Sequence, residues 1–241
     1  MMDFEIFEKK IIYCFQKYEI NCNDAIINNF YIFTKQLLSE NEKYNLTSLS
    51  EIDEIIIKHY IDSVLILKYF EIPKDAKIID IGTGAGFPAL PLYIMRNDLQ
   101  ITFLDSTNKK INFIKNTAEQ ITGNKKFIYH SGRAEQHGKN PKIRETYDIA
   151  LMRAVAKLSV LCELAAPYIH PEGFFVAYKG KNAENEIFEA QNAIKILGLK
   201  ITETAKFDLE DNKRTLIKIQ KLNKTPLLYP RQNSEIIKNP L

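Results

Sequence analysis

The spacing of apolar residues divides the chain into a helical first part and a later alternation of strands and helices. Apolar side chains from Ile26 to Leu37 recur at the three- and four-residue spacing of an amphipathic helix. A second helix is predicted from about Ile52 to Phe70, and the segment around Pro73 ends it. Residues 1–72 are therefore predicted to form an N-terminal helical extension, of which the first forty rest on periodicity alone.

From Lys77 onward, short apolar segments alternate with helical stripes. The first segment is apolar without interruption, which is typical of a strand covered on both faces. The last two segments are joined by a turn too short for a crossover, so they should pair antiparallel. Residues 73–241 are predicted to be one α/β domain: a seven-stranded, mostly parallel sheet with helices on both faces and an antiparallel last strand. The predicted strands are "KIIDI", "QITFLDS", "KFIYH", "YDIALMR", "GFFVAYKG", "LKITETAKF" and "RTLIKIQ".

Composition excludes several classes of protein. The chain has 241 residues and is 45% hydrophobic, enough for a sizeable core. Its first ten residues mix acids and bases, unlike a secretory signal, and its longest uncharged run, Ile81 to Met95, is too short to span a membrane. Cys14, Cys22 and Cys162 follow no metal-binding spacing, nor do the histidines. We expect a cytoplasmic protein with reduced thiols, no metal and no membrane segment.

Charge is informative through its distribution. A formal net charge of +3 is too small to identify a nucleic-acid-binding protein. The last 21 residues, "KLNKTPLLYPRQNSEIIKNPL", are basic, with Glu235 as their one acid. Such runs are either solvated surface or a surface for the RNA backbone. The cations concerned are Lys221, Lys224, Arg231 and Lys238 in this tail, and Lys109, Lys110, Lys115, Lys125 and Lys126 in a second group.

A glycine-rich turn follows the first predicted strand. In "IIDIGTGAGFPALP", Gly82, Gly84 and Gly86 alternate, and Phe87 stands where the dinucleotide-binding fingerprint has its third glycine. No Gly-Lys-Ser/Thr ending is present, so a nucleoside-triphosphate loop is excluded too. The segment is either a structural turn or a loop whose backbone approaches a ligand closely, at the sheet edge where α/β folds bind ligands.

Two acids accompany this turn. Asp80 precedes it by two residues, and Asp105 ends the second predicted strand, where an acid can accept hydrogen bonds from both ribose hydroxyls of an adenosine. Asp-x-Gly-x-Gly-x-Gly followed by such an acid resembles the loop of S-adenosylmethionine-dependent methyltransferases. Their cofactor carries a sulfonium, an ammonium and a carboxylate but no phosphate, so acids and backbone groups suit it better than an anion cradle.

Motifs outside the loop narrow the resemblance. The chain from about Asn41 to its C-terminus is similar to the bacterial 16S ribosomal RNA guanine-N7 methyltransferases, the glucose-inhibited division protein B family. It departs slightly at Ala89 and Met152, where relatives often have glycine and serine. The motifs that carry the resemblance are "NEKYNLTSL", "HYIDSV", "DIGTGAGFPALPL", "LDSTNKK", "RAVAKL", "YKGKNAENEI" and "YPR".

The resemblance implies a Rossmann-like methyltransferase fold, S-adenosylmethionine as cofactor, and 16S ribosomal RNA, free or within the small subunit, as partner. Arg153 and Lys179 would contact the substrate, donating to guanine O6 or holding a phosphate. Guanine N7 already presents a lone pair, so we expect positioning and no catalytic base. The implied cofactor-binding residues are Asp80, Gly82, Gly84, Phe87, Asp105, Ala134, Glu135 and Arg153.

Alternatives remain open at this level. Phe87 is also suited to a core, Glu135 to a solvated loop, and Arg153 to an ion pair with a nearby acid. His59 and Asp62, one helical turn apart, could form a local hydrogen bond or a cap. For the whole protein, the alternatives are a small-molecule or protein methyltransferase and a non-catalytic RNA-binding module with a vestigial loop.

Overall fold

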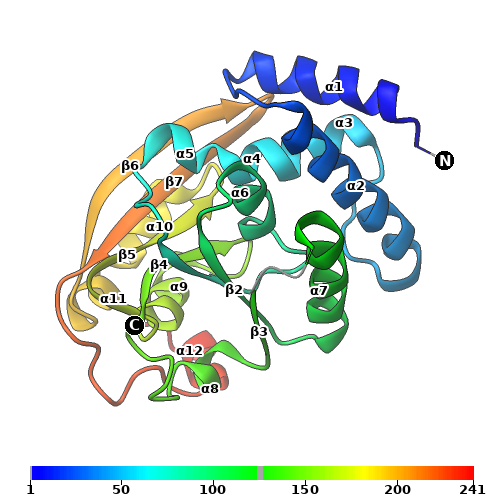
Figure 1. The fold of residues 1–241 in the computed structure, drawn as a ribbon. Coiled ribbons are helices and arrows are strands. Elements are labelled where there is room, and N and C mark those ends of the chain that lie inside the picture. The colour runs from blue at the N-terminus through cyan, green and yellow to red at the C-terminus, as the bar shows by residue number, and fades with distance from the viewer. Residues whose placement is uncertain (1, 124–126) are drawn as a thin grey trace.

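A computed structural model describes residues 2–123 and 127–241. Two helices open the chain, α1 (Phe4–Lys17) and α2 (Asp24–Tyr44). Each begins where a polar side chain accepts from a backbone N–H three residues on, Asp3 for α1 and Asn23 for α2. The two helices pack against each other at one side of the molecule (Figure 1).

The segment predicted as one helix from Ile52 to Phe70 is interrupted, and that prediction was wrong in this respect. It is divided into α3 (Ile52–Ile55), the π-helix η1 (Ile56–Ile61), α4 (Asp62–Val64) and α5 (Ile66–Tyr69). A π-helical turn widens the backbone spiral, and such turns occur frequently at functional sites. Here the backbone carbonyl groups of Lys58 and His59, in the π-helical turn, face the side chain of Arg153.

The sheet has the predicted class and direction of strands. Its order is β3-β2-β1-β4-β5-β7-β6, and every neighbouring pair is parallel except the two that involve β7. The predicted α/β fold with an antiparallel last strand is confirmed. The strands are β1 (Lys77–Ile81), β2 (Gln100–Asp105), β3 (Ile128–Ser131), β4 (Tyr147–Arg153), β5 (Ile169–Lys179), β6 (Leu199–Leu209) and β7 (Asn212–Lys221).

Helices cover both faces of the sheet (Figure 1). Successive residues of β1 show this directly: Ile78 belongs to the core shared with α1–α7, whereas Ile79 belongs to the core shared with α9–α12. Both side chains are fully buried, which explains why β1 reads as continuously apolar. The sheet helices are α6 (Ala89–Met95), α7 (Asn108–Thr122), α8 (Ala134–His137), α9 (Leu158–Ala165), α10 (Ala183–Glu189), α11 (Gln191–Ile196) and α12 (Asn233–Lys238).

Some details differ from the sequence patterns. The stripe from Ile187 to Leu197 forms two helices, α10 and α11, that meet at Ala190. The short helices α8 and α12 carry no long periodic signal and were not predicted. The predicted third strand began at Lys126, which lies outside the described residues. Because α1–α5 share one core with the sheet, a domain boundary at residues 72 and 73 stays a prediction. No helix in the described part of the chain is both long and apolar enough to cross a membrane.

Candidate cofactor and substrate site

Four of the predicted cofactor residues line one small cavity at the carboxyl edge of the sheet. Gly82 follows β1, Asp105 ends β2, and Ala134 and Glu135 begin α8 after β3. The cavity has a volume of about 130 Å³, and Val155 and Asn233 complete its wall. We call it the hollow. Asn233 comes from the C-terminal tail, a contribution that no sequence signal indicated.

The glycine turn is tied to the end of β2. The N–H groups of Gly82 and Thr83 donate to the carbonyl of Leu104 at 2.8 and 3.1 Å. The N–H of Gly84 donates to Asp105 Oδ2 at 3.0 Å, and the N–H of Thr107 donates to Asp105 Oδ1 at 2.9 Å. Gly82 and Gly84 have φ values of +74° and +62°, which residues with a β-carbon rarely adopt.

Asp80 lies beneath the turn rather than in the wall of the hollow. Its side chain is fully buried, and Oδ2 accepts from Thr83 Oγ1 at 2.7 Å and from the Ala89 N–H at 3.2 Å. Oδ1 has no hydrogen-bond partner among residues 2–123 and 127–241. Burial raises the pKa of Asp80 to about 7, although the two hydrogen bonds and Arg153 act in the opposite direction.

Phe87 joins the turn to the N-terminal helices through stacked rings. Its ring lies 4.4 Å from that of His59 and 5.1 Å from that of Phe33, centroid to centroid, with interplanar angles of 24° in both pairs. The guanidinium carbon of Arg153 lies 5.0 Å from the centre of the Phe87 ring, in cation–π range. Phe87 is therefore a buried core aromatic and also a support for Arg153.

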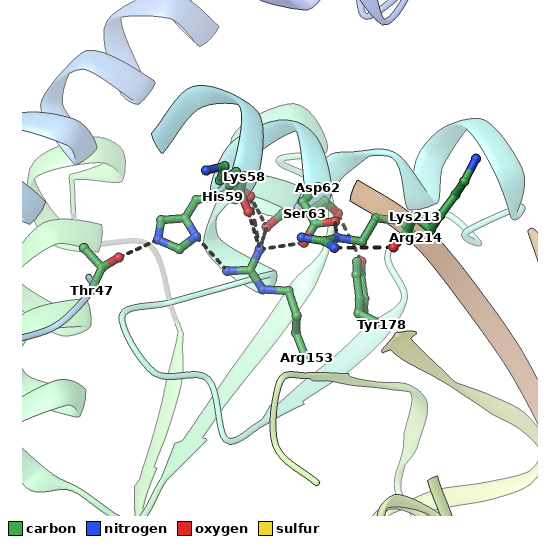
Figure 2. A network of polar contacts seen from close by, with 9 residues as sticks. All are labelled: Thr47, Lys58, His59, Asp62, Ser63, Arg153, Tyr178, Lys213 and Arg214. Carbon is green, nitrogen blue, oxygen red and sulfur yellow. Dashed lines mark hydrogen bonds and ion pairs between the residues drawn. The ribbon is translucent and has the colours of Figure 1, made fainter. Parts of the chain in front are cut away.

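Arg153 is the centre of a polar network between β4 and the π-helical turn (Figure 2). Its NH1 donates to Asp62 Oδ2 at 3.1 Å, and its NH2 lies 3.2 Å from His59 Nδ1. His59 Nε2 lies 2.7 Å from Thr47 Oγ1, so both ring nitrogens have partners. Arg214 Nε donates to Asp62 Oδ1 at 3.1 Å. The side chains of His59 and Asp62, for which a local hydrogen bond or a cap was considered, both hold Arg153.

Burial and charge keep the network in one protonation state. Burial and the neighbouring Arg153 lower the pKa of His59 to about 3, so the imidazole is neutral at neutral pH. Burial, reinforced by Asp62, raises the pKa of Tyr178 well above its usual value, and its hydroxyl donates to the Ser63 carbonyl at 3.0 Å. Arg153 thus faces a neutral imidazole and an acid, with neither of the buried rings ionised.

A larger cleft lies on the other side of Arg153. Its volume is about 480 Å³, and Lys58, Arg214 and Lys179 place cations in its wall. Lys179 Nζ donates to the carbonyl of Ala156 at 2.5 Å and forms an ion pair with Glu186 Oε2 at 2.6 Å. Its side chain is only 8% exposed. The predicted substrate residues Arg153 and Lys179 therefore line one cleft, both already held by acids.

A model of the family described as rRNA small subunit methyltransferase G matches residues 26–217. The chain belongs to this family. The protein of that name from Clostridium beijerinckii is 45% identical over 214 residues, 88% of this chain and 89% of the relative. The one from Clostridium novyi is 43% identical over 225 residues, 92% of each chain. The family resemblance seen in the sequence motifs is confirmed.

Several solved structures resemble this family member in architecture. The [4+2]-cyclase SpnF covers 79% of this chain and 93% of its own, with a TM-score of 0.57 and 11% identity. The TYW2 protein of M. jannaschii, solved with AdoMet, covers 73% and 79%, with a TM-score of 0.55 and 10% identity. At such low identity, the likeness concerns the fold alone.

In this member of the rRNA small subunit methyltransferase G family, the predicted cofactor residues fall into two groups. Gly82, Asp105, Ala134 and Glu135 line the hollow. The remaining four lie outside its wall: Asp80 is buried beneath the turn, Gly84 donates to Asp105, and Arg153, in the wall of the cleft, lies over the Phe87 ring. The sequence analysis did not single out four further residues of these walls: Val155 and Glu186, which lie within recognised motifs, and Arg214 and Asn233, which lie outside them.

Two of the four tail cations are held inside the protein, which neither of the two alternatives, solvated surface or a surface for RNA, had foreseen. Lys221 is fully buried at the end of β7, with its Nζ 2.6 Å from Glu145 Oε1. Arg231 pairs with the fully buried Glu163 through Nε at 2.9 Å and NH2 at 2.7 Å. These pairs anchor the tail to the turn before β4 and to α9, and only Lys224 and Lys238 of the four are exposed.

Three lysines of the second basic group, Lys109, Lys110 and Lys115, lie within the described residues. Lys109 Nζ lies 5.5 Å from the centre of the Tyr44 ring, and Lys110 Nζ lies 4.0 Å from Asp105 Oδ2. Lys125 and Lys126 lie outside the described residues. Within the described part of the chain, no group of three or more His, Cys, Asp or Glu side chains is arranged to hold a metal ion.

Proposed function

We propose that this protein transfers the methyl group of S-adenosylmethionine to N7 of a guanine in 16S ribosomal RNA. One observation carries the proposal: in a member of an rRNA methyltransferase family, the glycine turn, Asp105 and Glu135 line one hollow at the carboxyl edge of the sheet, beside a basic cleft. The resemblance in the sequence supplies the guanine N7 target and the 16S ribosomal RNA partner.

The donor set suits the proposed cofactor. Asp80 Oδ1 is a buried acceptor without a partner in the described residues, and it lies beneath the Gly82–Gly84 turn, where a cationic group is favoured. Asp105 lies in the wall of the hollow and each of its oxygens accepts one backbone N–H, which leaves lone pairs for the ribose hydroxyls. Gly82, Ala134 and the apolar Val155 contribute uncharged surface to the wall, in which Arg133 is a cation. S-adenosylmethionine supplies an electrophilic methyl group on a sulfonium.

The side chains of this chain act by binding and orienting. Guanine N7 loses no proton on methylation, so an in-line displacement needs aligned reactants rather than a base. Arg153 is fixed by Asp62, His59 and the Phe87 ring between the hollow and the cleft. A rigid guanidinium in this position can donate to guanine O6 and set the direction of N7.

The cleft fits a single nucleotide better than a duplex. Its volume of about 480 Å³ lies within the range of about 300–1,000 Å³ that is usual for small-ligand sites. Lys58 and Arg214 in its wall are suited to phosphate oxygens. We therefore infer that the target guanine is unpaired or flipped out when it enters the cleft.

Methyl transfer from labelled S-adenosylmethionine to ribosomal RNA from a cell that lacks the enzyme tests this function. Naked 16S RNA and intact small subunits are assayed in parallel, and the modified base is mapped. N7-methylguanine makes the RNA backbone cleavable by reduction followed by aniline, whereas a methyl group at another atom of the base leaves it uncut. Saturable cofactor binding without transfer would favour a vestigial RNA-binding module; transfer to another atom would refute the N7 assignment.

A further inference from the structure

We propose that Glu186 selects guanine by accepting hydrogen bonds from the N1–H and the N2 amino group of the base. The inference rests on the proposed function, because it assigns a residue that recognises the base to be methylated.

The reaction itself restricts how the base can be recognised. N7 must stay free to attack the methyl group, so no protein donor can occupy it in the reactive complex. O6 distinguishes guanine from adenine only as a single acceptor. The opposite edge of guanine presents two donors, N1–H and the N2 amino group, where adenine presents an N1 lone pair. A carboxylate accepts from both guanine donors and repels the adenine lone pair, which gives discrimination between the two purines.

Two carboxylates line the cleft, Asp62 and Glu186, and they differ in what they can still accept. Asp62 is held by an arginine on each oxygen, Arg153 on Oδ2 and Arg214 on Oδ1, and is 7% exposed. Glu186 uses only Oε2, which forms an ion pair with Lys179 Nζ at 2.6 Å and accepts from the Leu158 N–H at 2.8 Å. Its Oε1 has no hydrogen-bond partner within the described residues, and 16% of the side chain is exposed.

The same contacts hold Glu186 in place before a base arrives. Lys179 comes from β5, Leu158 begins α9, and Glu186 itself lies on α10, so three elements fix one carboxylate. A carboxylate that is already oriented loses little conformational entropy when it binds a base. Lys179 is thus a positioning residue for Glu186, which accounts for its near-complete burial better than a direct contact with RNA does.

Inosine at the target position tests the assignment, because it retains N1–H and N7 but lacks the N2 amino group. We would assemble 16S RNA with guanosine or inosine at the mapped target and measure single-turnover methylation at saturating S-adenosylmethionine. The wild-type enzyme should be roughly tenfold slower on inosine, the usual effect of one hydrogen bond to a charged group. Glu186→Gln should slow guanosine by roughly ten- to a hundredfold and bring the guanosine-to-inosine ratio close to one.

Matched variants separate recognition from structure. Glu184→Gln and Glu189→Gln change acids of the same helix that pair with Lys206 and Lys157 on the surface, and both should keep the wild-type ratio. Lys179→Met removes the ion pair but leaves the carboxylate, so its rate should fall while its ratio stays above one. A wild-type enzyme indifferent to inosine, or a folded Glu186→Gln variant with the wild-type ratio, would overturn the inference. Absence of N7 methylation by the wild-type enzyme would instead overturn the proposed function.

Discussion

The side chain of Val155 lies directly over Gly82. A β-carbon built at Gly82 would come within 2.8 Å of Val155 Cγ2, closer than carbon atoms pack. Val155 faces the hollow, whereas its neighbour Ala154 faces the cleft, so the segment between β4 and α9 separates the two proposed binding sites. Val155 therefore covers the glycine turn on the side of the hollow.

Gly82→Val should abolish detectable binding of S-adenosylmethionine while the protein stays folded. The valine would be strained at φ +74° and would meet Val155 in the space that the cofactor needs. Calorimetric titration measures the affinity, and circular dichroism measures folding. Gly123→Val is the matched control, because Gly123 also has positive φ, at +61°, but its β-carbon would meet no atom of the described residues within 4 Å. A folded Gly82→Val protein with wild-type affinity would refute the proposed cofactor position.

Cofactor affinity should rise with pH between about 5.5 and 7.5. The pKa of Asp80 is raised by burial to about 7, so the free protein carries a neutral Asp80 at the lower pH and a carboxylate at the upper one. Only the carboxylate attracts a cationic cofactor, and we expect a change in Kd of about tenfold over this interval. Asp80→Asn should bind more weakly and with a flat profile. A wild-type Kd that does not change with pH would show that the charge of Asp80 does not contribute to cofactor binding.

The same pKa predicts how stability depends on pH. The pKa of Asp80 is about 7 in the folded protein, against 3.8 for an ordinary aspartate, so the folded state binds more protons between these values. The contribution of Asp80 to the free energy of unfolding therefore falls as pH rises from about 4 to 7. Urea denaturation at several pH values should show a smaller decline over this window for Asp80→Asn than for the wild type.

The fold could be predicted from sequence because the signals for it are local. The continuous apolar strands, the helical stripes and the short turn between the last two strands are each determined by residues close together in the sequence. The observed sheet agrees with them. The cofactor loop was equally local, since Gly82 follows β1 and Asp105 ends the neighbouring parallel strand β2. Contacts between side chains far apart in the sequence were not predicted. Nothing near Arg231 in sequence reveals that Glu163 is fully buried beneath it.

The partners that hold the predicted substrate residues Arg153 and Lys179 in the cleft escaped prediction for the same reason. The acceptors around Arg153 come from a π-helical turn more than ninety residues earlier in the chain, and helical periodicity does not distinguish that turn from an α-helix. Glu186 belongs to the motif "YKGKNAENEI", but only packing shows that one of its oxygens is engaged while the other stays available. Whether a side-chain atom is free to bind a ligand depends on its packing partners, which only the three-dimensional structure shows.

Arg231→Met should destabilise the protein by about 3–5 kcal/mol, because it leaves the fully buried Glu163 carboxylate without its partner. Urea denaturation measures the loss. Lys238→Met, at an exposed position of the same tail, should change stability by less than about 0.5 kcal/mol. Truncation from Tyr229 onward would remove both Arg231 and the wall residue Asn233, so folding and cofactor binding should suffer along with RNA binding. A marginal effect of Arg231→Met would show that the tail is not an anchor.

The chemical step should be independent of pH near neutrality. His59 is the one histidine in the cleft wall, and burial beside Arg153 lowers its pKa to about 3, so it cannot titrate as a base near pH 7. With cofactor and RNA both saturating, Asp80 is held as a carboxylate, and its titration drops out of the rate as well. Single-turnover methylation from about pH 6.5 to 8.5 should therefore stay flat.

His59→Gln provides the decisive variant for this last expectation. In the folded protein His59 stays neutral, whereas the unfolded chain binds a proton below its usual pKa of 6.5, so its contribution to stability is lost as pH falls from about 6.5 towards 3. The variant should remove this acid sensitivity and weaken the support of Arg153, because Thr47 and Arg153 lose a common partner. Its single-turnover rate should change less than its stability or its binding. A loss of rate of about tenfold that follows pH would return a catalytic base to the mechanism, since general-base catalysis contributes at least that much, and would favour an exocyclic amine over N7 as the methylated atom.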